Sequence, residues 1–183
     1  MRASDVARRI AERLDEAGIP YAIGGALALG AWGAPRMTND VDISIFARLE
    51  DFGLVANTLE RAGLMIDRVG APKDLTRIGF FKAHSGRMAV DVFMSDHPLM
   101  KDLERNRRRV EVAGAHLWFI SPADLCVVKL LYGRPKDVVD LERLVVVRPE
   151  IDLQYVRSWV TRILPAGDDR IGVTDDLIRR FRP

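Results

Sequence analysis

The chain is poor in cysteine and has no long apolar run, and each absence narrows what it can be. Cys126 is its single cysteine, so an internal disulfide is excluded, which fits a reducing cytosol. No stretch approaches the roughly 18 apolar residues that a membrane span needs. Residues 1–18 mix charges into every turn instead of forming the apolar stretch of a signal peptide. We therefore expect a cytoplasmic protein with no membrane partner.

A strong excess of charge and a histidine metal site are missing as well. The formal net charge is only +2 over 183 residues, so a nucleic-acid partner would have to meet a local patch. The basic run over residues 105–109 could bind such a nucleic acid. The alternative is that it is simply a solvated charged face. The three histidines lack the spacing of zinc ligands. With 48% hydrophobic residues, the chain can bury one core, with or without a helical appendage.

Hydrophobic periodicity predicts helices and short strands up to residue 120 and helices alone beyond it. The predicted helices cover residues 5–17, 26–32, 49–62, 98–106, 122–132, 136–147, 152–163 and 172–181. The predicted strands cover residues 21–23, 40–46, 77–83, 88–94, 109–113 and 116–120, and residues 84–87 form a hairpin turn. We expect an α+β fold with a mixed sheet of about five strands flanked by helices in residues 1–120. A C-terminal helical region would follow in residues 121–183.

The strand over residues 40–46 carries the first candidate site. Its side chains alternate, so that Asp40 and Asp42 share one face and apolar side chains occupy the other. Two carboxylates on one face can bind hard cations, which prefer oxygen ligands. Taken alone, such a pair is usually the polar face of an edge strand.

Three neighbouring features favour the cation site. Gly24 and Gly25 join a strand to a helix, where a phosphate can approach the backbone; a plain tight turn is the alternative. Asp91 interrupts an apolar strand, and a cation shared with Asp40 and Asp42 would explain a charge at this position. A salt bridge to an arginine is the alternative. Arg36 and Thr38 place a cation and a hydroxyl directly before the aspartates, where a polyphosphate would lie.

The stretch from Ile23 to Ile43, with its Gly-Gly turn, short helix and Asp-x-Asp strand, resembles the signature of the DNA polymerase β-type nucleotidyltransferase superfamily. Asp91 stands where that signature places a third carboxylate on a later strand. The resemblance covers about residues 20–95. It is strongest to the small bacterial branch that includes abortive-infection-type toxins and antibiotic nucleotidyltransferases. Ala26 departs from the pattern, because many members place a phosphate-binding serine in this turn.

The resemblance implies a reaction and a role for each residue. Asp40 and Asp42 would bind two Mg²⁺ ions, and Asp91 would complete the catalytic metal site and could accept the proton of the nucleophile. Gly24 and Gly25 would hold the β- and γ-phosphates of a nucleoside triphosphate such as ATP. An acceptor hydroxyl would attack the α-phosphate in line, and pyrophosphate would leave.

A second cluster follows in the C-terminal region. Lys129 interrupts an apolar helix, and in related enzymes a similarly placed lysine faces the nucleotide phosphates. Asp137 and Asp140 begin the next helix, where acids are favourable on dipole grounds alone; a role in the site is the alternative.

The resulting hypothesis is a magnesium-dependent nucleotidyltransferase with the nucleotide in the cleft between the two regions. Its acceptor would be an RNA end, a protein hydroxyl or a small molecule, and a homodimer or antitoxin partner would fit. The rival hypothesis is a non-catalytic nucleotide-binding or regulatory member of a toxin–antitoxin-type pair.

Overall fold

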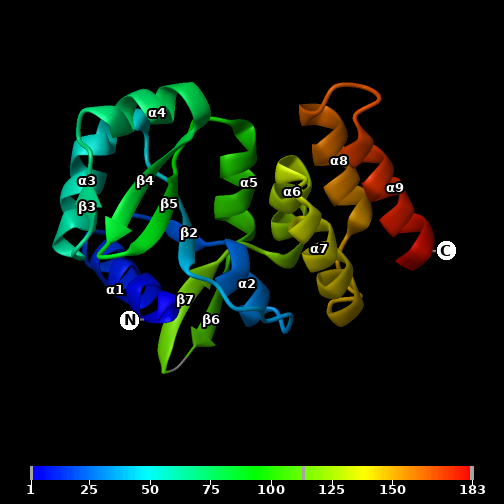
Figure 1. Cartoon of the computed structure of the whole chain (residues 1–183), viewed down its shortest axis with the longest axis horizontal. Helices are drawn as coiled ribbons and strands as arrows, with labels where there is room; N and C mark the ends of the chain where they lie inside the picture. The colour runs from blue at the N-terminus through cyan, green and yellow to red at the C-terminus, as the bar shows by residue number, and fades with distance from the viewer. Residues whose placement is uncertain (1, 113, 182–183) are drawn as a thin grey trace.

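The computed structural model describes residues 2–112 and 114–181. Within these residues, seven strands form one mixed sheet with helices packed against it (Figure 1). The strands are β1 (Tyr21–Ile23), β2 (Asp40–Ile45), β3 (Met65–Ile66), β4 (Phe80–Ser85), β5 (Met88–Phe93), β6 (Arg108–Val112) and β7 (Ala115–Phe119). The helices are α1 (Ala3–Glu16), α2 (Gly25–Ala31), α3 (Phe52–Arg61), α4 (Gly70–Ile78), α5 (Pro98–Asn106), α6 (Pro122–Tyr132), α7 (Pro135–Val147), α8 (Leu153–Ile163) and α9 (Asp169–Phe181), with a 3₁₀ turn at Leu49–Asp51.

The strand order places β2 in the middle of the sheet. The order is β3-β4-β5-β2-β1-β7-β6. Strand β2 runs parallel to β5 and antiparallel to β1, while β4 and β5 form an antiparallel hairpin. A central strand presents both faces to other elements, so the polar side chains of β2 lie inside the molecule rather than along an exposed edge.

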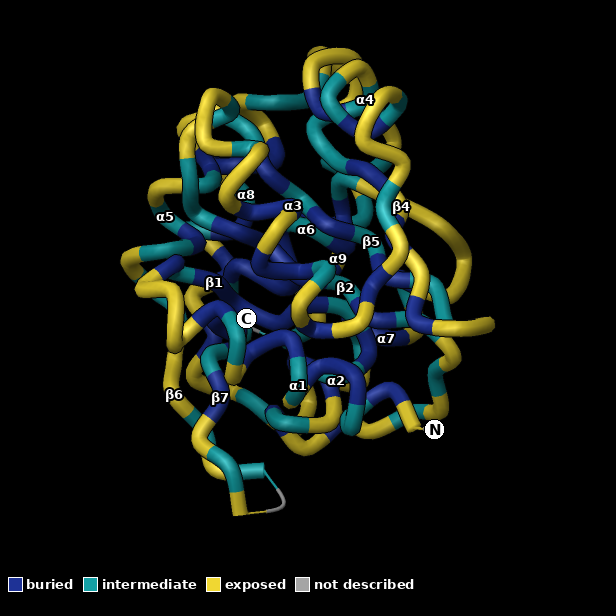
Figure 2. The backbone as a smooth tube through the Cα atoms, turned by 90° about the vertical axis from the view of Figure 1, so that its left-hand side faces the viewer, coloured by how far each residue is buried: buried dark blue, intermediate teal, exposed yellow. Residues whose placement is uncertain are grey.

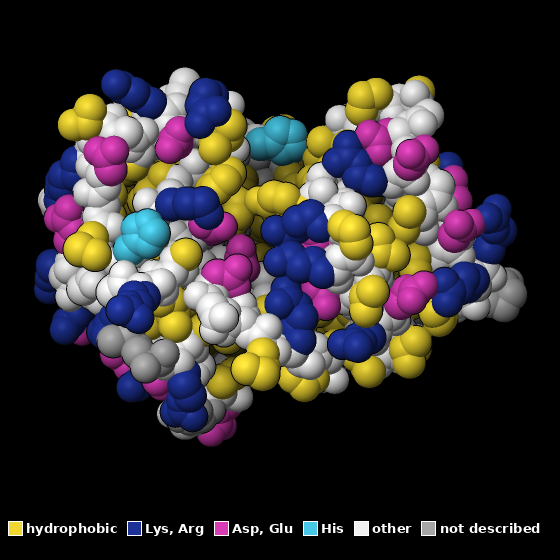
Figure 3. All heavy atoms as spheres, viewed as in Figure 1, with side chains coloured by type: hydrophobic (Ala, Val, Ile, Leu, Met, Phe, Trp, Pro, Cys, Tyr) yellow, Lys and Arg dark blue, Asp and Glu magenta, His cyan; other side chains and the backbone are white. Residues whose placement is uncertain are grey.

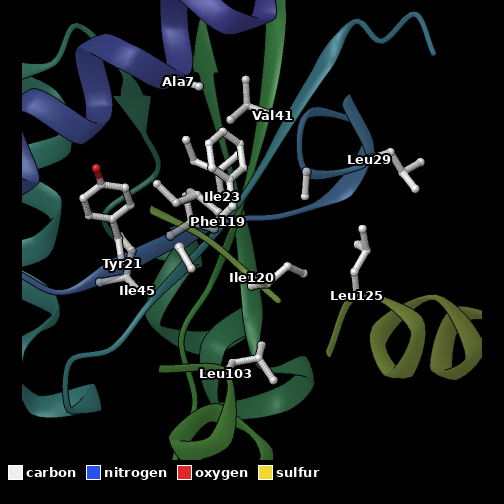
Figure 4. Packing of buried hydrophobic residues seen from close by; sticks show 14 of the residues in the cluster. Ala7, Tyr21, Ile23, Leu29, Val41, Ile45, Leu103, Phe119, Ile120 and Leu125 are labelled. Carbon is white, nitrogen blue, oxygen red and sulfur yellow. The ribbon is translucent and has the colours of Figure 1, made fainter. Parts of the chain in front are cut away.

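The apolar face of β2 forms the centre of the core. Val41, Ile43 and Ile45 are fully buried, and α1 covers this part of the sheet. Figure 2 shows that the buried stretches concentrate in the central strands and the helices around them. The hydrophobic cluster continues from the sheet through Ile120 to Leu125 on α6 (Figure 4). One continuous core therefore joins the sheet to the first C-terminal helix.

Helix α6 begins where the sequence predicted it. The Ser121 hydroxyl accepts a hydrogen bond from the backbone N–H of Asp124 (3.1 Å), and Pro122 occupies the first turn, an arrangement that favours helix initiation. Helices α7, α8 and α9 stand with α6 at one side of the sheet (Figure 1). The division between residues 120 and 121 stays a prediction. Among the described residues, no helix is long and apolar enough to cross a bilayer.

The fold class agrees with the prediction, but several elements differ. The sheet has seven strands within the described residues, not about five, because all six predicted strand segments join it and β3 adds a two-residue strand that was not predicted. Residues 77 and 78, predicted as strand, end helix α4, which the prediction missed. Gly79, at φ +76°, terminates this helix, since a left-handed conformation favours glycine. Residue 113, at the end of a predicted strand, lies outside the described residues.

Candidate active site

Three predicted carboxylates lie on one face of the sheet. Asp40 and Asp42 alternate along β2, and Asp91 on β5 is the register partner of Asp42. Adjacent strands are separated by about 4.8 Å, so Asp42 and Asp91 are direct neighbours. All three side chains are half-buried. The parallel pairing of β2 with β5 is what brings a residue far along the chain to the Asp-x-Asp pair.

Gly25 makes room for the Asp42 carboxylate. The backbone N–H of Gly24 donates to the carbonyl oxygen of Asp42 (2.8 Å), which holds the turn against β2. A Cβ atom on Gly25 would lie 1.7 Å from Asp42 Oδ2, and Gly25 has φ +55°. Both the space and the left-handed backbone therefore require glycine at this position. At Gly24 an added Cβ would meet only ordinary contacts, the nearest at 3.5 Å from Ile120 Cδ1.

The environment of Asp42 disfavours its charge. Burial, together with the neighbouring charges of Asp40 and Asp91, raises the pKa of Asp42 to about 6. Lys129 and Arg134 oppose this rise without cancelling it. A cation shared by the three carboxylates would relieve the repulsion and stabilise the ionised form.

Two of the carboxylates are paired with neighbouring side chains. The Thr38 hydroxyl donates a short hydrogen bond to Asp40 Oδ1, and the Lys82 ammonium donates to Asp91 Oδ1 at 2.7 Å. Over residues 2–112 and 114–181, no group of three or more His, Cys, Asp or Glu side chains is arranged to hold a metal ion. The donor chemistry nevertheless fits Mg²⁺, since three carboxylates share a face. A metal ion that binds through Oδ1 of Asp40 or Asp91 would displace these partners.

The carboxylates open into a cleft of about 250 Å³ between the sheet and helices α5, α6 and α7. The turn glycines Gly24 and Gly25 line it, as does Arg36, whereas Thr38 lies outside the lining. Figure 3 shows acidic side chains facing a column of lysine and arginine side chains across a hollow in this face. The basic residues that line the cleft, which we call the basic wall, are Arg36, Lys129, Arg134 and Lys136. A larger and more open hollow, of about 550 Å³ beside Phe46 and His97, contains none of the predicted site residues.

The basic wall is held by a buried network of charges. Lys129 is 3% exposed, and its ammonium lies 2.6 Å from Asp140 Oδ2 and 3.3 Å from Asp137 Oδ1. Arg36, from the loop before β2, pairs with Asp140 at 3.0 Å. Burial alone would raise the pKa of Asp137, but the hydrogen bond from Arg134 and the charge of Lys129 outweigh it, so the pKa is lowered. Both aspartates therefore serve as buried counter-ions for the basic wall.

The predicted site residues did not include Lys82, Tyr132, Arg134 and Lys136. Lys82 contacts Asp91, Tyr132 stands 43% exposed at the cleft, and the Arg134 guanidinium lies 4.8 Å from the Tyr132 ring centre. The Lys82 contact could have been found from the hairpin turn. A two-residue turn, with Gly86 at φ +61°, pairs Ser85 with Met88 and therefore Lys82 with Asp91. The predicted four-residue turn gives a different register.

Solved structures similar to this chain include nucleotidyltransferases. The solution structure of the antibiotic-resistance factor ANT(2'')-Ia matches with a TM-score of 0.61 and 16% identity over 98% of this chain and 100% of that one. The crystal structure of ANT(2'')-Ia in complex with adenylyl-2''-tobramycin has a TM-score of 0.60 and 17% identity over 87% of this chain and 96% of that one.

A further match is a candidate nucleotidyltransferase from Thermotoga maritima, with a TM-score of 0.50 and 18% identity over 78% of this chain and 92% of that one. No protein-family model and no curated protein sequence matches the chain. The likeness is thus one of architecture at low sequence identity. It agrees with the resemblance found in the sequence: the chain has the nucleotidyltransferase fold.

Proposed function

We propose that the protein is a magnesium-dependent nucleotidyltransferase that moves a nucleoside monophosphate from a nucleoside triphosphate to an acceptor hydroxyl and releases pyrophosphate. The observation that carries this proposal is the register of Asp42 with Asp91, one strand apart, with Asp40 on the same face and Gly25 against the Asp42 carboxylate. A scaffold has no need for three neighbouring carboxylates, one of them with a raised pKa. A site for divalent cations does.

The residues divide into a metal side and a phosphate side. Asp40, Asp42 and Asp91 would hold two Mg²⁺ ions, which when bound stabilise the negative charge that builds up on the entering and leaving oxygens. Asp91 is also the candidate acceptor for the proton of the attacking hydroxyl. Asp91 lines the cleft and 21% of its side-chain surface is exposed, so an acceptor hydroxyl in the cleft can reach it.

On the phosphate side, Gly24 and Gly25 line the same cleft as the basic residues. Arg36 is the candidate direct phosphate ligand and Lys129 a second cation of the phosphate side, and both share Asp140 as a counter-ion. An entering polyphosphate would compete with Asp140 for Arg36, the more exposed of the two cations. Lys129 is so deeply buried that its part would be long-range attraction rather than direct contact. Thr38 would act only through its bond to Asp40.

ATP is the first donor to test, because a structural relative was crystallised with an adenylylated molecule. The acceptor classes are those that carry a free hydroxyl: an RNA end, a protein side chain or a small molecule such as an antibiotic. A toxin–antitoxin-type setting would supply a protein partner and remains part of the hypothesis.

Pyrophosphate release tests the function whichever molecule serves as the acceptor. The protein is incubated with each ribonucleoside triphosphate, with Mg²⁺ or with EDTA, and with RNA, a protein extract or an aminoglycoside. We expect magnesium-dependent release with one acceptor class, and loss of release in Asp40→Asn/Asp42→Asn. This variant is the appropriate control because it relieves repulsion and so should keep the metal-free fold.

Two results would contradict the proposed function. If the double variant retained the full biological effect of the wild type, the catalytic proposal would be refuted and the regulatory alternative favoured. Release that persists unchanged in EDTA would likewise contradict a role for Mg²⁺.

A further inference from the structure

The Lys82 side chain forms an ion pair with Asp91, the third carboxylate of the candidate metal site. Strands β4 and β5 are antiparallel, and Lys82 is the register partner of Asp91. The Lys82 ammonium lies 2.7 Å from Asp91 Oδ1, within the range of charge-assisted hydrogen bonds. Asp42 is the partner of Asp91 on its other side. Asp91 therefore stands between a carboxylate on β2 and an ammonium on β4.

The exposure of the pair shows that the contact is easily exchanged. The Lys82 side chain is 59% exposed and that of Asp91 is 21% exposed. Exposed ion pairs contribute little net stability, since water competes for both partners. The ammonium lies 5.9 Å from the centre of the Phe80 ring, so an aromatic face is available close to its position on Asp91. Lys82 can thus leave Asp91 without disturbing the sheet.

We propose that Lys82 is a positioning residue that pairs with Asp91 in the metal-free protein and competes with the divalent cation for that carboxylate. The inference rests on the proposed function, because it takes Asp91 to be a metal ligand. The Lys82 ammonium and a metal ion cannot share one lone pair of Asp91 Oδ1, so a metal ion that binds through this oxygen displaces Lys82. In the metal-free protein Lys82 ties the Asp91 carboxylate to β4. Lys82 thereby weakens metal affinity and sets the metal concentration at which the three carboxylates come together.

The test is to measure the affinity for Mn²⁺ by electron paramagnetic resonance, with the whole chain and without nucleotide. Lys82→Met should tighten Mn²⁺ binding about two- to five-fold, the range expected for displacing an exposed ion pair. Lys82→Arg keeps the charge and should bind Mn²⁺ no more tightly than the wild type. Lys73→Met removes an exposed lysine on α4 and controls for the loss of one positive charge. Equal or weaker binding by Lys82→Met would overturn the proposal.

A double-mutant cycle separates direct competition from the general electric field. In an Asp91→Asn background, Lys82→Met should no longer change Mn²⁺ affinity. If the tightening were the same with and without Asp91, Lys82 would act through its field alone, and the competition would be refuted.

The same cycle distinguishes this inference from the proposed function. Asp91→Asn by itself must weaken Mn²⁺ binding if Asp91 is a ligand. If it does not, the metal site itself fails. If Asp91→Asn weakens binding but Lys82→Met leaves it unchanged, only the role of Lys82 fails.

Discussion

Replacing Asp42 by asparagine should stabilise the metal-free protein, although it removes a candidate catalytic group. Burial, with Asp40 and Asp91 beside it, raises the pKa of Asp42 from 3.8 to about 6. Because the folded pKa lies above the unfolded one, the carboxyl's contribution to stability is fully present below pH 4 and is lost as the pH rises through 6. At pH 7.5 the shift of about two pKa units corresponds to a penalty of about 3 kcal/mol. Asparagine has nearly the same shape and carries no charge to bury.

The assay is urea denaturation in EDTA at several pH values. Asp42→Asn should be more stable than the wild type by up to about 3 kcal/mol at pH 7.5, and by roughly half that amount at pH 5. Exposed Asp96 supplies the control, since Asp96→Asn should show no comparable gain. Added Mg²⁺ should narrow the difference by stabilising the wild type alone. An Asp42→Asn variant that is no more stable than the wild type at pH 7.5 would refute the account of this carboxyl.

Two further substitutions test the architecture around the site by chemical denaturation. Gly25→Ala should lower the free energy of unfolding by roughly 2 kcal/mol or more, because the added methyl group meets the Asp42 carboxylate and the backbone is left-handed. Gly24→Ala should change it by less than about 1 kcal/mol. Equal effects of the two substitutions would contradict this account. Lys129→Met should lose roughly 3–5 kcal/mol, because it leaves two buried carboxylates without their shared ammonium. Combining it with Asp140→Asn should recover part of that loss, and a Lys129→Met protein of wild-type stability would show that the network is not structural.

The metal side of the site could be predicted because its signals are local. The alternation around Asp40 and Asp42 is a period-two pattern within one strand, and the Gly-Gly turn lies shortly before it. Asp91 is conspicuous as a single charge in an apolar strand. Joining Asp91 to Asp42 required more, since the sequence does not specify which strands pair in parallel. The resemblance to nucleotidyltransferases supplied that step, and the register of β2 with β5 agrees with it.

The contacts of the buried charge network could not be predicted. Arg36 and Asp140 are 104 positions apart, so neither motif indicates that one neutralises the other. The sequence indicated instead that Asp140 lies near the start of a helix, where its charge interacts favourably with the helix dipole. Its burial, at 3% exposed, comes from the packing of α7 against α6, a property of the whole fold.

Small errors in local elements also had consequences at the site. Helix α4 is short and begins with Gly70-Ala71-Pro72, residues that indicate a turn rather than a helix. With that helix missed, the following strand was placed too early and the hairpin turn was made too long. The resulting register separated Lys82 from Asp91. One misplaced turn thus concealed the contact on which the role of Lys82 depends.

The most direct test of the central claim is calorimetric titration of the purified protein with each of the four ribonucleoside triphosphates, with and without Mg²⁺. The account predicts that at least one triphosphate binds only when Mg²⁺ is present, and that Asp40→Asn/Asp42→Asn abolishes this binding while remaining folded. Binding that is equally tight in EDTA, or that survives in the double variant, would contradict a metal site formed by Asp40, Asp42 and Asp91.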